Sequence, residues 1–143
     1  MSNTQSKPPE ASRARRPIRT VIVDDSPVAL ESLRLFLGTD EGCELAGSGQ
    51  SGREAVELAA ALHPDLVLLD LEMPGMNGLD ATRQIKRQAD PPLVVIVTVY
   101  NDDGWRKAAA AAGADGFIWK SEVALTLLPV IHRLFDQRKR RGS

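Results

Sequence analysis

The 143-residue sequence contains little cysteine, histidine or aromatic residue, and each scarcity narrows what the protein can be. Its single cysteine, Cys43, excludes an internal disulfide and a zinc site built on cysteines, so a reducing compartment is expected. The two histidines belong to no Ser/His/Asp arrangement, and His63 and His132 are expected to be surface or capping residues. No apolar run reaches membrane-spanning length, and the first residues lack the apolar centre of a secretory signal. We therefore expect a cytoplasmic protein without a membrane partner.

The charge is distributed unevenly along the chain. Residues 1–19 carry five basic residues against one acid, and residues 133–143 repeat this excess, although the net charge is −1. We expect residues 1–18 to be a disordered basic tail, residues 19–137 to be one folded domain, and residues 138–143 to be a basic tail or a truncated linker. A basic tail can contact nucleic acid, but the acidic centre argues against nucleic acid as the main partner.

Apolar runs typical of strands alternate with helical patterns five times. Strands are expected over 19–25, 43–49, 65–71, 93–99 and 115–120, and the run at 93–99 is the strongest. Ser26 and Pro27 open the first helix and Gly38 ends it, while Pro129 favours Thr126 as the cap of the last helix. This alternation predicts a doubly wound α/β fold, a parallel sheet covered by helices on both faces.

Polar residues interrupt these strands at their carboxyl ends. Asp24 and Asp25, Asp70, Thr98 and Lys120 end the first, third, fourth and fifth strands. These ends share one edge of a parallel sheet, where ligands bind. Oxygen ligands without imidazole or thiolate favour Mg²⁺, and Mg²⁺ beside a lysine makes a site for a phosphoryl group. Carboxylates are known phosphoryl acceptors, so Asp70 is the natural nucleophile.

A glycine-rich stretch, "AGSGQSG", places Gly47, Gly49 and Gly52 in the G-x-G-x-x-G spacing of dinucleotide-binding proteins. It follows the second strand, whereas a dinucleotide site would follow the first, where Asp24 and Asp25 would repel a pyrophosphate. We interpret the glycines as a flexible loop into the second helix, capped by Ser51.

Four segments in order identify a family. "VIVDDSPVAL", "PDLVLLDLEMPGMNGLDATRQIK", "VVIVTVYND" and "AAGADGFIWK" resemble the receiver domain of bacterial two-component response regulators. The resemblance runs from about Thr20 to the last helix. It implies a flavodoxin-like (βα)5 three-layer sandwich with a five-stranded parallel sheet in the order 2-1-3-4-5.

The resemblance also implies a role for each site residue. Asp70 would accept a phosphoryl group from a sensor histidine kinase or a histidine phosphotransfer protein, with Lys120 pairing to a phosphoryl oxygen. Thr98 would turn inward to bind another oxygen, and Phe117 would be the aromatic switch residue that moves with it, although an ordinary core aromatic is the alternative. Asp25 would bind Mg²⁺ directly and Asp24 would act largely through water. Asp70 and the backbone carbonyl of Glu72 would supply further ligands.

The expected output is a phosphorylation-dependent change in the surface made by the fourth helix, fifth strand and fifth helix, which would control partner binding or homodimerisation. DNA would be a partner only through an output domain missing from this chain, as in a helix-turn-helix regulator. No enzymatic turnover is expected beyond the protein's own phosphorylation and dephosphorylation.

Two alternatives remain open, together with one departure from the family. An aspartyl-phosphate phosphatase would need a second Asp where this chain has Glu72, and a degenerate receiver would lack part of the acidic site. Val99 stands where family members usually carry a smaller residue. We expect it to narrow access to the phosphorylated site.

Overall fold

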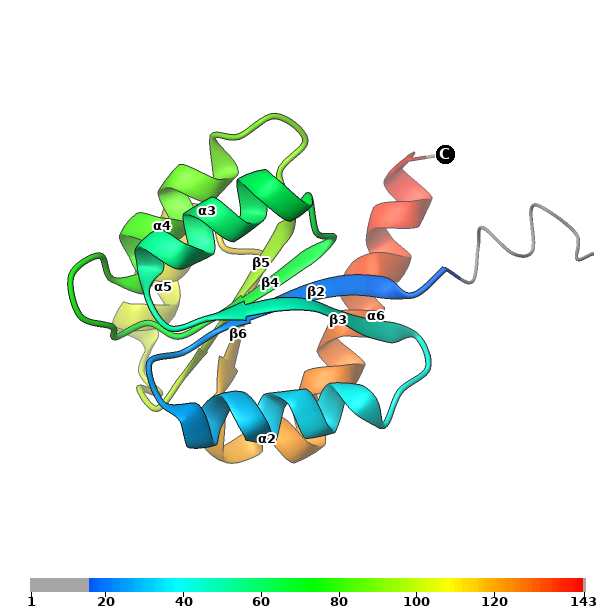
Figure 1. The fold of residues 1–143 in the computed structure, drawn as a ribbon, viewed down its shortest axis with the longest axis horizontal. Coiled ribbons are helices and arrows are strands. Elements are labelled where there is room, and N and C mark those ends of the chain that lie inside the picture. Colours follow the sequence, from blue (N-terminus) through cyan, green and yellow to red (C-terminus); the bar gives the residue numbers. More distant parts are fainter. Residues whose placement is uncertain (1–15, 143) are drawn as a thin grey trace, which may run out of the picture.

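Five short strands form where they are expected, and the three central ones are rich in β-branched residues and leucine. The computed structural model describes residues 16–142, with side chains through Arg138. All strands are parallel, and the sheet order β3-β2-β4-β5-β6 is the predicted order 2-1-3-4-5, because the first strand carries the label β2 (Figure 1). The strands are β2 Ile18–Val23, β3 Cys43–Gly49, β4 Leu66–Leu69, β5 Leu93–Thr98 and β6 Gly116–Trp119.

Helices cover both faces of the sheet, which confirms the predicted fold class. Strand residues alternate between two apolar cores, as the two-residue period of a β-strand requires. One core lies against α3, α4 and α5, and the other against α2 and α6 (Figure 1). The helices are α2 Pro27–Gly38, α3 Gly52–Leu62, α4 Gly78–Lys86, α5 Asp103–Ala112 and α6 Val123–Gly142, with the 3-10 helix η1 at Lys120–Glu122.

Side-chain caps fix where several helices begin. The hydroxyl of Ser26 accepts a hydrogen bond from the backbone N–H of Ala29, and the hydroxyl of Ser51 accepts one from Glu54. Both satisfy helix N–H groups that have no partner within the helix, so both predicted helix starts are confirmed. His63 ends α3 in the left-handed conformation, as a capping residue.

The last helix begins earlier than the sequence predicted. Thr126 is not its cap: α6 starts at Val123, and the Thr126 hydroxyl donates to the carbonyl of Glu122 within the first turn. Pro129 therefore lies inside the helix, where its missing N–H removes one backbone hydrogen bond. Leu127 and Ile131, both fully buried, anchor the helix on either side of Pro129, so tertiary packing overrides the local preference.

The glycine-rich stretch is not a flexible loop. Gly47 and Gly49 lie in strand β3, and Gly52 is the first residue of α3. A Cβ atom on Gly52 would lie 2.4 Å from the backbone oxygen of Met76, so the chain needs glycine there for close approach. The sequence missed this because Met76 is distant in the chain.

The two ends of the predicted domain differ in what the structure describes. Residues 1–15 lie outside the described residues, so the tail predicted there stays a prediction. Strand β2 starts at Ile18, the last position of the predicted tail. Helix α6 continues through Gly142, across the predicted boundary at 137. Within residues 16–142, no helix combines the length and the apolar character needed to cross a membrane.

The contact between Gly52 and Met76 generates a stability prediction. Gly52→Ala should lower the free energy of unfolding by about 1–3 kcal/mol, because the new methyl group forces two backbone segments apart. Gly38→Ala is the matched control, since nothing lies within 4 Å of a Cβ atom there. Urea unfolding followed by circular dichroism measures both. Equal stability of the two variants would refute the close-approach argument.

Candidate functional site

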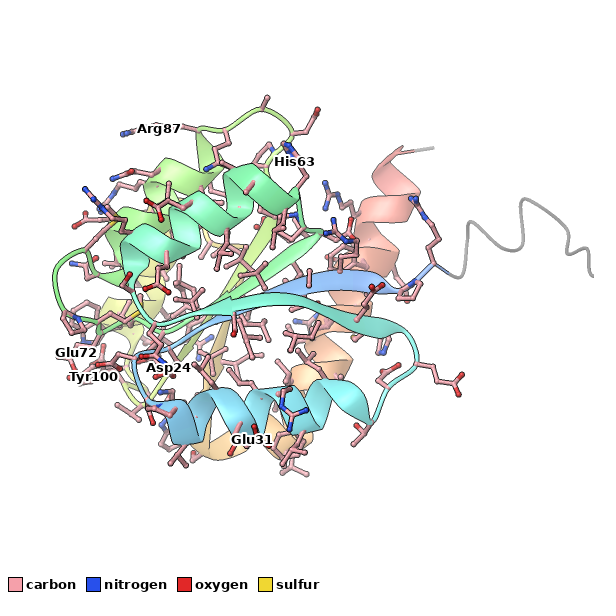
Figure 2. All side chains as sticks on the ribbon, viewed as in Figure 1. Asp24, Glu31, His63, Glu72, Arg87 and Tyr100 are labelled. Atoms are coloured by element: carbon pink, nitrogen blue, oxygen red, sulfur yellow. The ribbon has the colours of Figure 1, made fainter. Side chains whose placement is uncertain are left out.

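The carboxyl edge of the sheet brings the predicted polar residues together. Asp24 and Asp25 follow β2, Asp70 follows β4, Thr98 ends β5 and Lys120 follows β6. One carboxylate oxygen from each of the three aspartates lies within 4.8 Å of the others. In Figure 2 the labels of Asp24, Glu72 and Tyr100 lie on the same side of the view, and His63 lies away from them. Four residues spread over almost a hundred positions of sequence thus form one cluster, Asp24, Asp25, Asp70 and Lys120, and Thr98 ends a strand at the same edge.

Asp24 is the most deeply placed carboxylate of the site. Its side chain is buried, and Lys120 Nζ lies 2.6 Å from its Oδ2 atom. Its Oδ1 atom accepts a hydrogen bond of 2.9 Å from the backbone N–H of Ser26, the residue that caps α2. The start of α2 and the end of β6 therefore hold this carboxylate from two sides.

Asp70 is buried but less well compensated. Its Oδ1 atom accepts a hydrogen bond from the backbone N–H of Leu71 at 2.9 Å and lies 3.6 Å from Lys120 Nζ. Burial, followed by the negative charge of Asp24, raises the pKa of Asp70 to about 6, against a smaller opposing effect of Lys120. Ionised Asp70 is therefore electrostatically costly in this protein.

Lys120 is the cation that balances these acids. Burial disfavours its charged form, but its hydrogen bond with Asp24 and the nearby charge of Asp70 together raise its pKa. The ammonium group is closer to Asp24 than to Asp70 by 1.0 Å. Lys120 thus lies within reach of any anionic group attached to Asp70 while it remains anchored on Asp24.

Thr98 and Phe117 lie beside the acidic cluster rather than in contact with it. The Thr98 side chain is fully buried, and its hydroxyl accepts a hydrogen bond of 3.1 Å from the backbone N–H of Tyr100. Phe117 is half-buried and packs against the core on the α3, α4 and α5 side of the sheet. In this arrangement the Thr98 hydroxyl is engaged with its own loop.

The site opens into a cavity of about 390 Å³. Asp70 and Lys120 line it, and so does Val99, which is 61% exposed. Glu72 and Tyr100 both line the cavity, and hydrogen bonding to the Glu72 carboxylate raises the pKa of the Tyr100 phenol. The complete lining is Asp25, Asp70, Glu72, Met73, Pro74, Val99, Tyr100 and Lys120.

Two aromatic residues of this region were not selected from the sequence. Tyr100 lines the cavity and follows Thr98 by only two positions. Trp119 ends β6, and its indole N–H donates a hydrogen bond of 3.1 Å to the backbone carbonyl of Val99. A strand that ends in the site necessarily brings such neighbours with it, and this is the signal that could have found them.

The donor set fits a hard divalent cation. Three carboxylates close together carry more negative charge than Lys120 neutralises, and all their ligand atoms are oxygen. The described residues bring no histidine or cysteine into this cluster. Asp25 is exposed and Asp70 faces the cavity, so an ion can enter with part of its hydration shell, as Mg²⁺ prefers.

Comparisons with known proteins agree with this geometry. The response regulator receiver domain family matches residues 20–132. The chain is 39% identical over 109 residues to the transcriptional regulatory protein YdfI of Bacillus subtilis, and these residues cover 76% of this chain and 51% of YdfI. It is 30% identical over 119 residues to the nitrate/nitrite response regulator protein NarL of Escherichia coli, covering 83% and 55%. The chain thus spans about half the length of the curated relatives it matches.

The fold is shared with a solved receiver structure. The response regulator domain of Thermotoga maritima CheB superposes with a TM-score of 0.77 at 31% identity, covering 82% of this chain and 96% of that chain.

The raised pKa of Asp70 predicts how the free energy of unfolding depends on pH. A folded-state pKa near 6, above the ordinary value, means that stability is lost as pH rises from about 4 through about 6. Without metal, Asp70→Asn should therefore raise the free energy of unfolding by about 1–3 kcal/mol at pH 8, and the gain should vanish near pH 4. Urea unfolding in a chelator at several pH values measures this, with exposed Glu44→Gln as a control of equal charge change. A gain that is independent of pH would contradict the assignment.

Proposed function

Because this chain belongs to the response regulator receiver domain family, we propose that it accepts a phosphoryl group on Asp70 in a Mg²⁺-dependent reaction. The observation that carries the proposal is the juxtaposition of buried Asp70 with Asp24, Asp25 and Lys120 beside a cavity that Asp25, Asp70 and Lys120 line. The donor is a sensor histidine kinase or a histidine phosphotransfer protein, and the protein acts with it in the cytoplasm.

The transfer is a substitution at phosphorus. An oxygen of the Asp70 carboxylate bonds to the phosphorus atom while the bond between phosphorus and the donor's imidazole nitrogen breaks, and the electron pair of that bond stays on the nitrogen. The product is an acyl phosphate, and the donor histidine is left neutral after it takes a proton. Lys120, 3.6 Å from the Asp70 carboxylate, can pair with a phosphoryl oxygen without leaving Asp24.

The carboxylates of Asp24, Asp25 and Asp70 and the backbone carbonyl of Glu72 would hold Mg²⁺. Bound there, the ion supplies positive charge that offsets the developing negative charge on the phosphoryl oxygens. Asp24 keeps Lys120 oriented, and the backbone N–H of Leu71 fixes the rotation of the Asp70 carboxylate. The chain thereby prepares the acceptor before any donor arrives.

The signal then passes through Thr98 to the neighbouring strand. The Thr98 hydroxyl gives up the hydrogen bond that it accepts from the Tyr100 N–H and donates one to a phosphoryl oxygen, and Phe117 moves with it. The surface affected is α5, β6 and α6, which are the fourth helix, fifth strand and fifth helix of the chain. A change in this surface controls the binding of a protein partner or a second copy of the chain. Any DNA binding would belong to an output domain outside this chain.

Phosphorylation of Asp70 is directly testable. Incubation with acetyl phosphate and Mg²⁺ should add the mass of one phosphoryl group to the wild-type protein, and Asp70→Asn should abolish the adduct because the nucleophile is lost. Asp103→Asn, a change of the same kind at an exposed position of α5, should keep the adduct. Intact-protein mass spectrometry measures all three proteins. An adduct that persists on Asp70→Asn would sink the assignment, as would the absence of any adduct from this donor and from a cognate kinase.

Val99 provides a second test. Its exposed branched side chain lines the same cavity as Asp70. Val99→Ala should therefore accelerate phosphorylation by acetyl phosphate, hydrolysis of the acyl phosphate, or both, by several-fold. Time courses of the phosphorylated mass give both rates. Val28→Ala, at an exposed valine of α2, is the control and should leave both rates unchanged. If Val99→Ala also leaves both unchanged, Val99 does not restrict access.

A further inference from the structure

An arginine of α5 covers the aromatic residue of β6. The guanidinium carbon of Arg106 lies 4.8 Å from the centroid of the Phe117 ring, within the range of a cation–π interaction. Asp102 and Asp103 stand four and three residues earlier, at spacings that favour ion pairs on a helix. None of the ion pairs formed by the described side chains uses Arg106, however. The guanidinium is directed to the ring instead.

Phe117 is therefore held from two sides. The ring packs against the apolar core beneath α5, while Arg106, itself exposed, covers it from the solvent side. In the sheet Phe117 pairs with Ile96, and Trp119 pairs with Thr98. Because side chains alternate along a strand, Phe117 lies on the same face of the sheet as Thr98, one diagonal step away.

Two further contacts join β6 and α5 to the segment that follows Thr98. Trp119 donates its indole N–H to the carbonyl of Val99, and Tyr100 stacks on Trp105 with ring centroids 5.6 Å apart. The N–H of Tyr100 is also the present partner of the Thr98 hydroxyl. Thr98 and its loop are thus joined to β6 and α5 in one arrangement, and the contact of Arg106 with Phe117 adds a further link between α5 and β6.

We propose that Arg106 is a positioning residue that holds Phe117 in its unphosphorylated position and so sets how readily the protein switches. This inference rests on the proposed function. When the Thr98 hydroxyl turns toward Asp70, it moves toward β4 and away from β6, which leaves space on the β6 side for the Phe117 ring. The ring can enter that space only by leaving the guanidinium of Arg106. The contact exists in one state and not in the other, which is the condition for shifting an equilibrium.

The size of the effect follows from the exposed setting of Arg106. A solvent-exposed cation–π contact corresponds to about a two- to five-fold change in an equilibrium constant. Arg106→Gln should therefore increase the ratio of switched to unswitched protein about two- to five-fold. It should lower by the same factor the concentration of phosphoryl analogue that produces half-maximal switching.

The position of Phe117 can be followed directly. The chain has three phenylalanines, so protein labelled with 4-fluorophenylalanine gives three ¹⁹F resonances, and Phe117→Leu identifies the one from Phe117. Titration with beryllium fluoride at fixed Mg²⁺ mimics phosphorylation. In Arg106→Gln we expect the chemical shift of the Phe117 resonance before any addition to lie nearer its value in the fully switched protein. We also expect the titration midpoint to occur at a lower beryllium fluoride concentration.

Lys107→Gln is the matched control, because it removes the same charge from the next exposed position of α5. It should titrate as the wild type does. Equal shifts in both variants would mean a general charge effect and would overturn the proposal, as would an Arg106→Gln titration that coincides with the wild type. In the Phe117→Leu background, Arg106→Gln should no longer change the beryllium fluoride midpoint, now read from tryptophan fluorescence. An undiminished change there would show that Arg106 acts elsewhere and would equally overturn it.

Failure of this proposal is distinguishable from failure of the proposed function. If wild-type protein forms the acyl phosphate and its Phe117 resonance responds to beryllium fluoride, the proposed function stands and only the role of Arg106 is under test. If the wild type forms no adduct and shows no response, both fall together.

Discussion

The site depends on one electrostatic constraint, the burial of aspartates at the carboxyl edge of a parallel sheet with a single lysine to balance them. Lys120 lies on Asp24 and reaches toward Asp70, yet burial and the charge of Asp24 still raise the pKa of Asp70 to about 6. Stability alone does not explain why aspartates occupy these buried positions, because an apolar side chain there would cost less folding free energy. The cluster is understandable as a place prepared for positive charge and for a phosphoryl group.

The fold brings these charged residues together although they are far apart in the sequence. Parallel strands β2, β4, β5 and β6 all end at the same edge, so one or two polar residues after each strand are enough to build the site. Ser26, the cap of α2, also contributes to the site. Its backbone N–H donates to the Asp24 carboxylate, and its hydroxyl accepts a hydrogen bond from the first turn of the helix. The residue that starts α2 therefore also positions a carboxylate of the site.

Sequence patterns predicted the elements and the polar residues well because both depend on near neighbours in the chain. Ser26 and Ser51 were identifiable as caps, and Asp70 stood out as an acid after a buried strand. What the sequence could not reveal depends on contacts between distant segments. Gly52 looked flexible because its close neighbour Met76 lies in another loop, and Pro129 looked terminal because Leu127 and Ile131 hold the helix only once it is packed. The roles of the site residues, as distinct from their positions, remain predictions.

The aromatic contacts around β6 were not predicted for the same reason, because they join segments that are distant in the sequence. Phe117 and Trp119 lie on the same face of β6. Phe117 contacts Arg106 of α5, and Trp119 donates a hydrogen bond to the Val99 carbonyl in the loop before α5. Strand β6 has four residues and pairs with β5 at the edge of the sheet, and these aromatic contacts add to that pairing on the α5 side. Thr98, buried beside Trp119 in the sheet, is the point where the acidic edge meets this set of contacts. Under the proposed function, the contacts to be exchanged are therefore the exposed ones at α5, and not the buried pairing of β5 with β6.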